Sequence, residues 1–108
     1  MDLLSFPDAA AQLGIPVNRL HQLVRDGRLI ALRGDDGPRG IPASFIKDGA
    51  VVKWLPSVIT MLRDAQFEDA EIVAWLHRDD DSLPGAPIEA LRENRGSEVK
   101  RRAQVAGY

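Results

Sequence analysis

The sequence predicts a mainly α-helical fold with a small β wing: a winged helix-turn-helix followed by a short C-terminal helical region. Two observations carry this prediction. First, two short amphipathic segments, residues 5–13 and 17–26, are separated by Gly14, which suits the left-handed residue that ends a helix. Second, Gly27 ends the second segment, and two short apolar segments around a Gly/Asp-rich loop follow directly.

The first helix is expected from about Ser5 to Leu13. Ser5 is a good N-cap residue, and Asp8 follows three residues later, close to a capping box. Pro7 falls in the first turn, where its missing N–H costs little. The apolar residues that this helix is expected to bury are Phe6, Ala10 and Leu13.

The second helix is expected from about Val17 to Asp26. At about 100° per residue, its apolar and polar residues separate onto opposite arcs. The apolar arc holds Val17, Leu20, Leu23 and Val24. The polar arc holds Asn18, Arg19, His21, Gln22, Arg25 and Asp26.

A strand, a tight turn and a return strand are predicted to form the wing. The turn is indicated by residues 34–38, where two glycines, two aspartates and a proline are adjacent. The strands are expected at 28–33 and 39–41, and Pro42 ends the second of them. A short helical turn and a short strand are expected next, at 43–46 and 50–52.

The remaining chain is expected to be helical, which divides the protein into a winged helix-turn-helix domain at 1–54 and a C-terminal helical domain at 55–108. Helices are predicted at 57–65 and 69–77, a short one from Pro87, and a last one capped by Ser97. Trp54 and Trp75 are expected in the core or at its edge. The buried faces are expected to hold Val58, Ile59, Leu62, Ile72, Val73, Leu76, Ile88, Leu91, Val99 and Ala103.

Size and composition are those of one small globular chain, with 108 residues and no cysteine. The missing cysteines exclude disulfides and Cys-ligated zinc and fit a reducing compartment. The first residues lack a signal-peptide pattern, and no apolar run approaches the ~20 residues of a membrane span. We therefore expect no membrane partner and a cytoplasmic protein, associated with the nucleoid when it is bound to DNA.

The net charge of −2 argues weakly against a DNA partner, but its distribution matters more. Residues 1–47 hold six basic and five acidic side chains, whereas residues 64–81 hold seven acids and one base. Residues 92–102 are basic again, with five bases and two acids. The acidic middle and the basic run are expected to be solvated faces, and the run could also contact phosphates or a protein partner.

The polar arc of the second helix carries the side chains that read and grip DNA. Asn18, Arg19 and Gln22 are the candidates for base edges, because Arg pairs with guanine and Asn or Gln with adenine. His21, Arg25 and Arg28 are better placed for phosphates. Arg33 and Arg39, at the base of the wing, are expected to grip the DNA backbone, while Asp35 and Asp36 at its tip would repel it. A plain αα-hairpin is the competing interpretation of the two helices.

The sequence gives little support for catalysis. We expect that the protein is not an enzyme and that it binds no metal ion and no cofactor. His21 and His77 lack metal-ligand partners at helical spacing. The aspartates at 79–81 are consecutive and lack the Gly and Glu of a calcium loop. Neither a nucleophile motif nor a phosphate-binding glycine loop is present.

The segment from Phe6 to Ile15, followed by Arg19 to Leu29, resembles the DNA-binding domain shared by MerR-type regulators and phage excisionases. In those proteins the same frame of alanines, Leu-Gly and a later Gly carries the helix-turn-helix, and the wing follows directly. Pro16 departs from their pattern, because it stands where they have a capping Ser or Thr. MerR-type proteins dimerise through a long helix after the wing, which Pro56, Pro84 and Pro87 rule out here.

The C-terminal half looks like that of a small actinobacterial family in which a winged helix precedes a helical domain of unassigned function. The matching segments are 62–67, Trp75-Leu76, 83–88, 90–96 and 98–104. This half is also loosely similar to the toxin-binding region of some antitoxins. The resemblance implies a cytoplasmic DNA-binding protein with a regulatory role.

Taken together, the sequence predicts a protein that binds double-stranded DNA, with the helix at 17–26 in the major groove and the wing at 28–41 on the backbone. Transcriptional regulation is the expected use, and it would require a homodimer or clustered sites. Two alternatives stay open. One is a protein-interaction module, antitoxin-like or an adaptor, that docks a partner through the C-terminal half. The other is an architectural, excisionase-like DNA binder with little sequence preference.

Overall fold

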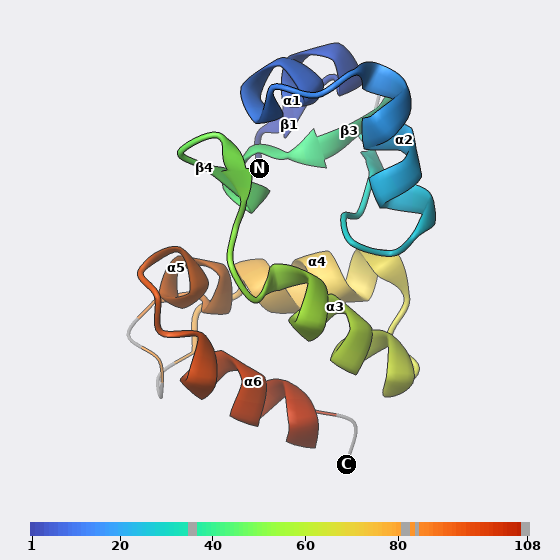
Figure 1. Cartoon of the computed structure of the whole chain (residues 1–108). Helices are drawn as coiled ribbons and strands as arrows, with labels where there is room; N and C mark the ends of the chain where they lie inside the picture. Colours follow the sequence, from blue (N-terminus) through green and yellow to red (C-terminus); the bar gives the residue numbers. More distant parts are fainter. Residues whose placement is uncertain (35–36, 81–82, 84, 107–108) are drawn as a thin grey trace. The chain divides into compact units, whose positions relative to one another are not determined.

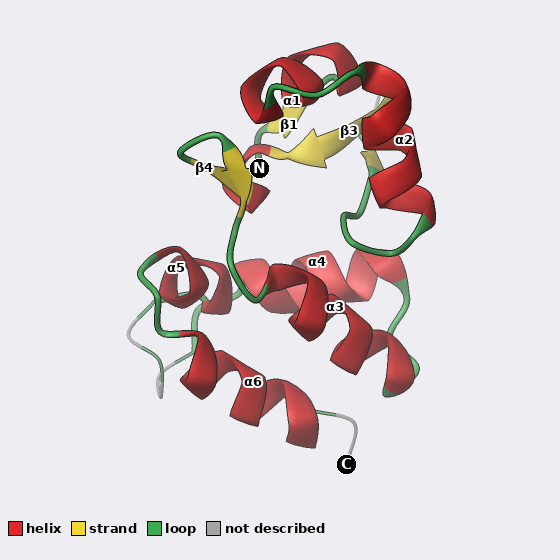
Figure 2. Cartoon of the chain, in the orientation of Figure 1, coloured by secondary structure: helices red, strands yellow, loops and turns green. Residues whose placement is uncertain are grey.

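The computed structural model describes residues 1–34, 37–80, 83 and 85–106. The chain divides into two compact units, Met1–Val52 and Lys53–Tyr108. Figure 2 shows helices in both units and a small set of strands in the first. The predicted fold class, mainly α with a β wing and C-terminal helices, is confirmed. The division into a winged helix-turn-helix domain at 1–54 and a C-terminal helical domain at 55–108 stays a prediction.

The first unit is built around a three-stranded antiparallel sheet with β3 in its centre, in the order β1-β3-β2. Helices α1 and α2 pack against each other, and α1 also contacts β3 and the β4–β5 hairpin. Figure 1 shows these elements in blue to green. Their bounds are β1 Leu3–Leu4, α1 Phe6–Leu13, α2 Val17–Arg25, β2 Leu32–Arg33, β3 Arg39–Pro42, a 3-10 turn Ala43–Phe45, β4 Ile46–Lys47 and β5 Ala50–Val51.

Helix α1 begins and ends where the sequence predicts. The Ser5 side chain accepts a hydrogen bond from the backbone N–H of Asp8 at 3.1 Å, and Gly14 ends the helix with φ of 66°. The buried face differs from the expected one, because Ala9 and Ala10 are fully buried while Phe6 and Leu13 are only half-buried. The small alanines allow α1 to lie close to the sheet, and the larger side chains flank that contact.

Helix α2 stops at Arg25, one residue before the predicted end. Leu20 is fully buried, and Leu23 and Val24 are half-buried, as expected of the apolar arc. Val17, on the same arc, is 38% exposed. It lies in the first turn of α2, where the helix has only begun to approach its neighbours.

The wing is shorter than predicted on its first strand. Strand β2 contains only Leu32 and Arg33, whereas Leu29 and Ile30 are buried but lie outside the ladder. Gly27, with φ of 79°, redirects the chain after α2, so these apolar residues enter the core before the strand begins. The predicted turn at 34–38 falls partly on Asp35 and Asp36, outside the described residues.

Strand β1 was not predicted, and neither was β4. β1 pairs with β3 in the register Leu3 to Pro42 and Leu4 to Ile41. At Gly40 a Cβ would lie 2.8 Å from the carbonyl oxygen of Leu4 and 2.9 Å from the Leu3 Cβ. Glycine at this position therefore allows β3 to lie close beside β1. The preceding residue of β3, Arg39, pairs with Arg33 of β2 in the wing.

The second unit is a four-helix arrangement in which α3 contacts α4 and α6, and α5 contacts α4 and α6 (Figure 1). The bounds are α3 Leu55–Asp64, α4 Asp69–His77, α5 Pro87–Arg92 and α6 Gly96–Val105. The buried residues predicted for these helices are confirmed as buried. None of the helices in the described part of the chain is long and apolar enough to cross a membrane.

Two helix starts in this unit differ from prediction. α3 begins at Leu55, two residues before Ser57, because Trp54 turns the chain with φ of 73° and Pro56 fits the first turn. α6 begins at Gly96 with Arg95 at the N-cap, so Ser97 lies inside the helix and does not cap it. The left-handed residue Asn94, with φ of 63°, ends α5 and leads straight into α6.

Candidate nucleic-acid interface

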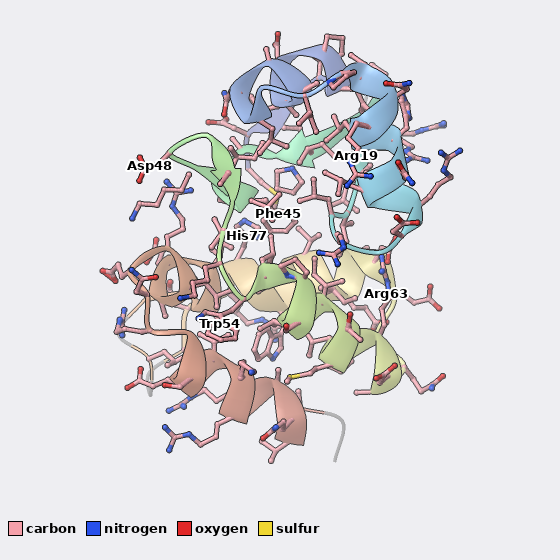
Figure 3. The ribbon with its side chains drawn as sticks, in the orientation of Figure 1. Arg19, Phe45, Asp48, Trp54, Arg63 and His77 are labelled. Atoms are coloured by element: carbon pink, nitrogen blue, oxygen red, sulfur yellow. The ribbon has the colours of Figure 1, made fainter. Side chains whose placement is uncertain are left out.

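Helix α2 presents a stripe of polar side chains to solvent. Asn18, Gln22 and Arg25 follow one another at helical spacing and are all exposed. Beside them, Arg19 Nη1 donates a hydrogen bond to Gln22 Oε1 at 2.9 Å, and Figure 3 labels Arg19 on this helix. The Gln22 amide nitrogen stays available as a donor, so the pair presents guanidinium and amide groups in a fixed relation.

Three side chains from different elements form a row next to this stripe. The ring of His21, on α2, lies 4.4 Å from the ring of Phe6, on α1, with an interplanar angle of 32°. The guanidinium carbon of Arg39, on β3, lies 5.7 Å from the centre of the Phe6 ring. Phe6 thus links the helix to the wing and limits where His21 and Arg39 can point.

Arg33 and Arg39 face each other across the wing. The β2–β3 register pairs them directly, and opposite residues in an antiparallel ladder project to the same side of the sheet. Both side chains are exposed. Two like charges in this position repel each other, so the arrangement favours an anion that binds both.

The arginines of the first unit lack acidic partners among the described residues. In the second unit, by contrast, Arg63 pairs with Asp69 at 2.9 Å and Arg95 with Glu93 at 2.8 Å. No such pair involves the five arginines at 19, 25, 28, 33 and 39 within the described part of the chain. As far as the described residues go, this part of the surface is therefore cationic despite the acidic net charge of the protein.

Arg28 is the last of the predicted contact residues, and the start of α2 adds backbone groups that were not predicted. Arg28 is exposed in the turn after α2, outside the polar stripe. Pro16 precedes α2 and offers no side-chain cap, yet the helix starts at Val17. Because the first N–H groups of a helix have no partner within it, this end suits an anion.

The sequence missed Phe6 as part of this surface. Its place in the first turn of an amphipathic helix indicates burial, and nothing local shows that a ring from α2 and a cation from β3 will meet on it. Asp35 and Asp36, predicted at the wing tip, lie outside the described residues. Among the residues that are described, no three His, Asp or Glu side chains come together as metal ligands would.

The other basic region is partly neutralised. In the run 92–102, Arg95 binds Glu93 and Glu98, and Arg102 lies 4.0 Å from Asp80. Trp75 is half-buried and Trp54 is 40% exposed, so of the two places expected for these rings, the core or its edge, Trp54 occupies the edge. The left-handed backbone of Trp54 turns the ring toward the surface.

Comparison with known proteins assigns this chain to a family. Residues 1–46 match the model "DNA-binding protein Rv2175c, wHTH domain", and residues 52–107 match "Rv2175c C-terminal domain of unknown function". The chain belongs to the Rv2175c family. The resemblance to an actinobacterial winged-helix family is thereby confirmed.

Rv2175c is similar to nearly the whole chain, both in sequence and in its solved structure. The DNA-binding protein Rv2175c of Mycobacterium tuberculosis (strain ATCC 25618 / H37Rv) is 36% identical over 114 residues, covering 94% of this chain and 78% of the relative. The NMR structure of Rv2175c matches with a TM-score of 0.89 and 36% identity, covering 99% of this chain and 82% of that one. The winged helix-turn-helix described above is therefore the family's DNA-binding domain fold.

Proposed function

We propose that this protein binds double-stranded DNA, with α2 in the major groove and the β2–β3 wing against the backbone. The observation that carries the proposal is the set of exposed arginines on α2 and the wing, which have no acidic partner among the described residues. The family's winged helix-turn-helix and the DNA-binding relative support it. The proposal is of a binding protein, without catalysis or a cofactor.

Bases are read by the stripe on α2. Asn18 and Gln22 each offer an amide that can pair with adenine, and Arg19 offers two donors to guanine. The hydrogen bond between Arg19 and Gln22 orients both side chains before DNA arrives, which lowers the entropy cost of docking. The expected preference is for a short site read by one helix.

Phosphates are held around this stripe. Arg25 and Arg28 lie at and beyond the end of α2, His21 lies beside the stripe, and the uncapped start of α2 offers backbone N–H groups. The paired Arg33 and Arg39 clamp one stretch of backbone from the wing. These contacts provide most of the affinity, because each releases condensed counterions.

Regulation of transcription is the use we propose. A single small module binds weakly, so a regulator would act as a homodimer or on clustered sites, with half-sites about one helical turn apart. An architectural role with little sequence preference is the alternative, because the phosphate contacts outnumber the base contacts. Selection on random duplexes separates the two: a regulator enriches a motif, and an architectural protein enriches none.

A salt titration tests DNA binding itself. Fluorescence anisotropy of a labelled duplex should show binding whose log–log salt slope is roughly −4 to −5, as about five released cations predict. Localised binding should shift the amide signals of α2 and the wing in NMR spectra of the full chain. Absence of binding at low salt, or binding without shifts in those elements, would refute the proposal.

The row from His21 through Phe6 to Arg39 gives a test of positioning without any change of charge. Phe6→Leu should weaken DNA binding by about 0.7–1.4 kcal/mol, or roughly 3- to 10-fold, because ring stacking and the cation–π contact are lost. Phe6→Tyr keeps the ring and should bind as the wild type does. Equal affinities for all three proteins, with equal stability in urea, would show that Phe6 does not position these contacts.

A further inference from the structure

The second unit contains a hollow that DNA binding by the first unit does not use. Its volume is about 320 Å³. Its walls are formed by Trp54, which precedes α3, and by one side of α6. Figure 3 labels Trp54 beside these helices. The lining residues are Trp54, Ser97, Lys100, Arg101 and Gln104.

Trp54 adopts an unfavourable backbone conformation in this wall. Its φ is 73°, in the left-handed region, which is strained for a bulky residue. Yet Trp54 is 40% exposed, so full burial of the side chain does not explain the conformation. Such strain concentrates at ligand-binding positions, where a side chain must be held in one place.

Gly96 fixes the ring from the other side. A Cβ at position 96 would lie 2.8 Å from Trp54 Cγ and 2.9 Å from Nε1, which is too close for any other residue. The indole therefore rests on the bare backbone at the start of α6. The remaining surface of the ring forms an apolar wall in a fixed orientation.

Cations surround this wall. Lys100 Nζ lies 4.6 Å and Lys53 Nζ 5.3 Å from the centre of the indole, and Arg101 is exposed next to them. No salt bridge to these three side chains occurs within the described residues, whereas the neighbouring Arg95 is neutralised by Glu93. The hollow thus combines an aromatic wall with an excess of positive charge.

We propose that this hollow binds an acidic segment of a partner protein. A large apolar side chain of the segment packs on the indole of Trp54, and carboxylates on either side pair with Lys53, Lys100 and Arg101. An aromatic wall suits such a side chain, and would gain little from a hydrated phosphodiester, so a peptide is favoured over duplex DNA. The inference concerns the C-terminal domain of unknown function and is independent of DNA binding by α2.

The test is an NMR titration of the full chain, without DNA, against a synthetic peptide. The probe is acetyl-Glu-Asp-Phe-Asp-Glu-amide, and the matched probe has Ser in place of Phe. Binding should be weak but saturable, with a dissociation constant below about 1 mM. The indole N–H signal of Trp54 and the α6 amides should shift, while the indole signal of Trp75 stays in place; the Ser probe should bind at least about 10-fold more weakly.

Matched charge reversals locate the contact. Lys100→Glu and Arg101→Glu should each lower the affinity for the Phe-containing peptide at least about 10-fold. Arg78→Glu makes the same change of charge on another part of the unit and should leave this affinity unchanged. Arg101 is exposed, so its variant remains informative if Lys100→Glu disturbs folding.

Three results would overturn the proposal. One is the absence of Trp54 shifts with the Phe probe. Another is a duplex that shifts the Trp54 signal at lower concentration than the peptide, which would assign the hollow to DNA. The third is a shift that depends on protein concentration alone, which would assign it to a second copy. Each leaves the test of DNA binding by α2 unaffected.

Discussion

Replacing Arg33 and Arg39 together by glutamine should weaken binding to every duplex by a similar factor and make the salt slope shallower by about 1.8. The two side chains face each other across β2 and β3, so we expect both to hold phosphates, which carry no sequence information. Glutamine keeps much of each side chain and removes only the charge. The affinity for a preferred duplex and for a scrambled one should therefore fall in parallel.

The corresponding change on α2 should behave differently. Arg19→Gln with Arg25→Gln removes the same charge, but Arg19 is expected to read a base. The slope should again become shallower, and discrimination between preferred and scrambled duplexes should fall by about 1–3 kcal/mol. Anisotropy titrations between about 50 and 200 mM salt measure both quantities.

A double variant in the second unit controls for net charge. Lys53→Gln with Arg78→Gln removes two positive charges outside α2 and the wing, and it should change the slope little. If this control weakens DNA binding as much as the wing pair does, the effect is one of overall charge, and the proposed interface is wrong. If neither arginine pair changes the slope, α2 and the wing do not contact phosphates.

Leu20→Ala should lower the free energy of unfolding by about 2–5 kcal/mol. Leu20 is fully buried and is the apolar residue of α2 with the deepest position, so its loss leaves a cavity beneath the polar stripe. A domain of this size has a total stability of only about 5–15 kcal/mol, so the loss is a large share. Urea unfolding followed by circular dichroism measures the change.

Val17→Ala is the matched control for this change, because Val17 lies on the same helix and is 38% exposed. Its effect on stability should be below about 1 kcal/mol. If Leu20→Ala is as mild as Val17→Ala, α2 is not held by the packing described here. If both variants keep full stability but lose DNA binding, the polar stripe rather than the core is disturbed.

The helices of the interface could be predicted because their ends are encoded locally. Ser5 caps α1 through a hydrogen bond to the next turn, and Gly14 and Gly27 take left-handed conformations at the points where the chain must turn. The alternation of apolar and polar residues then identified the exposed face of α2. These signals act over three or four residues, which a single sequence displays directly.

The rest of the interface depends on contacts between distant residues. Leu3 pairs with Pro42, and the row on Phe6 joins three elements, so neither could be read from local patterns. Trp54 was expected in the core or at its edge, but its left-handed backbone has no sequence signal. Only the assembled structure shows which apolar residues support a surface rather than a core.

Trp54 and Gly96 occupy a single shared space, because the ring fills the volume where any other residue would place its Cβ. Position 96 is therefore held to glycine for as long as the indole stays in this place. A lineage that replaces the glycine must first give up the indole, and one that loses the indole no longer needs the glycine. Among the family's members, the two positions should therefore co-vary.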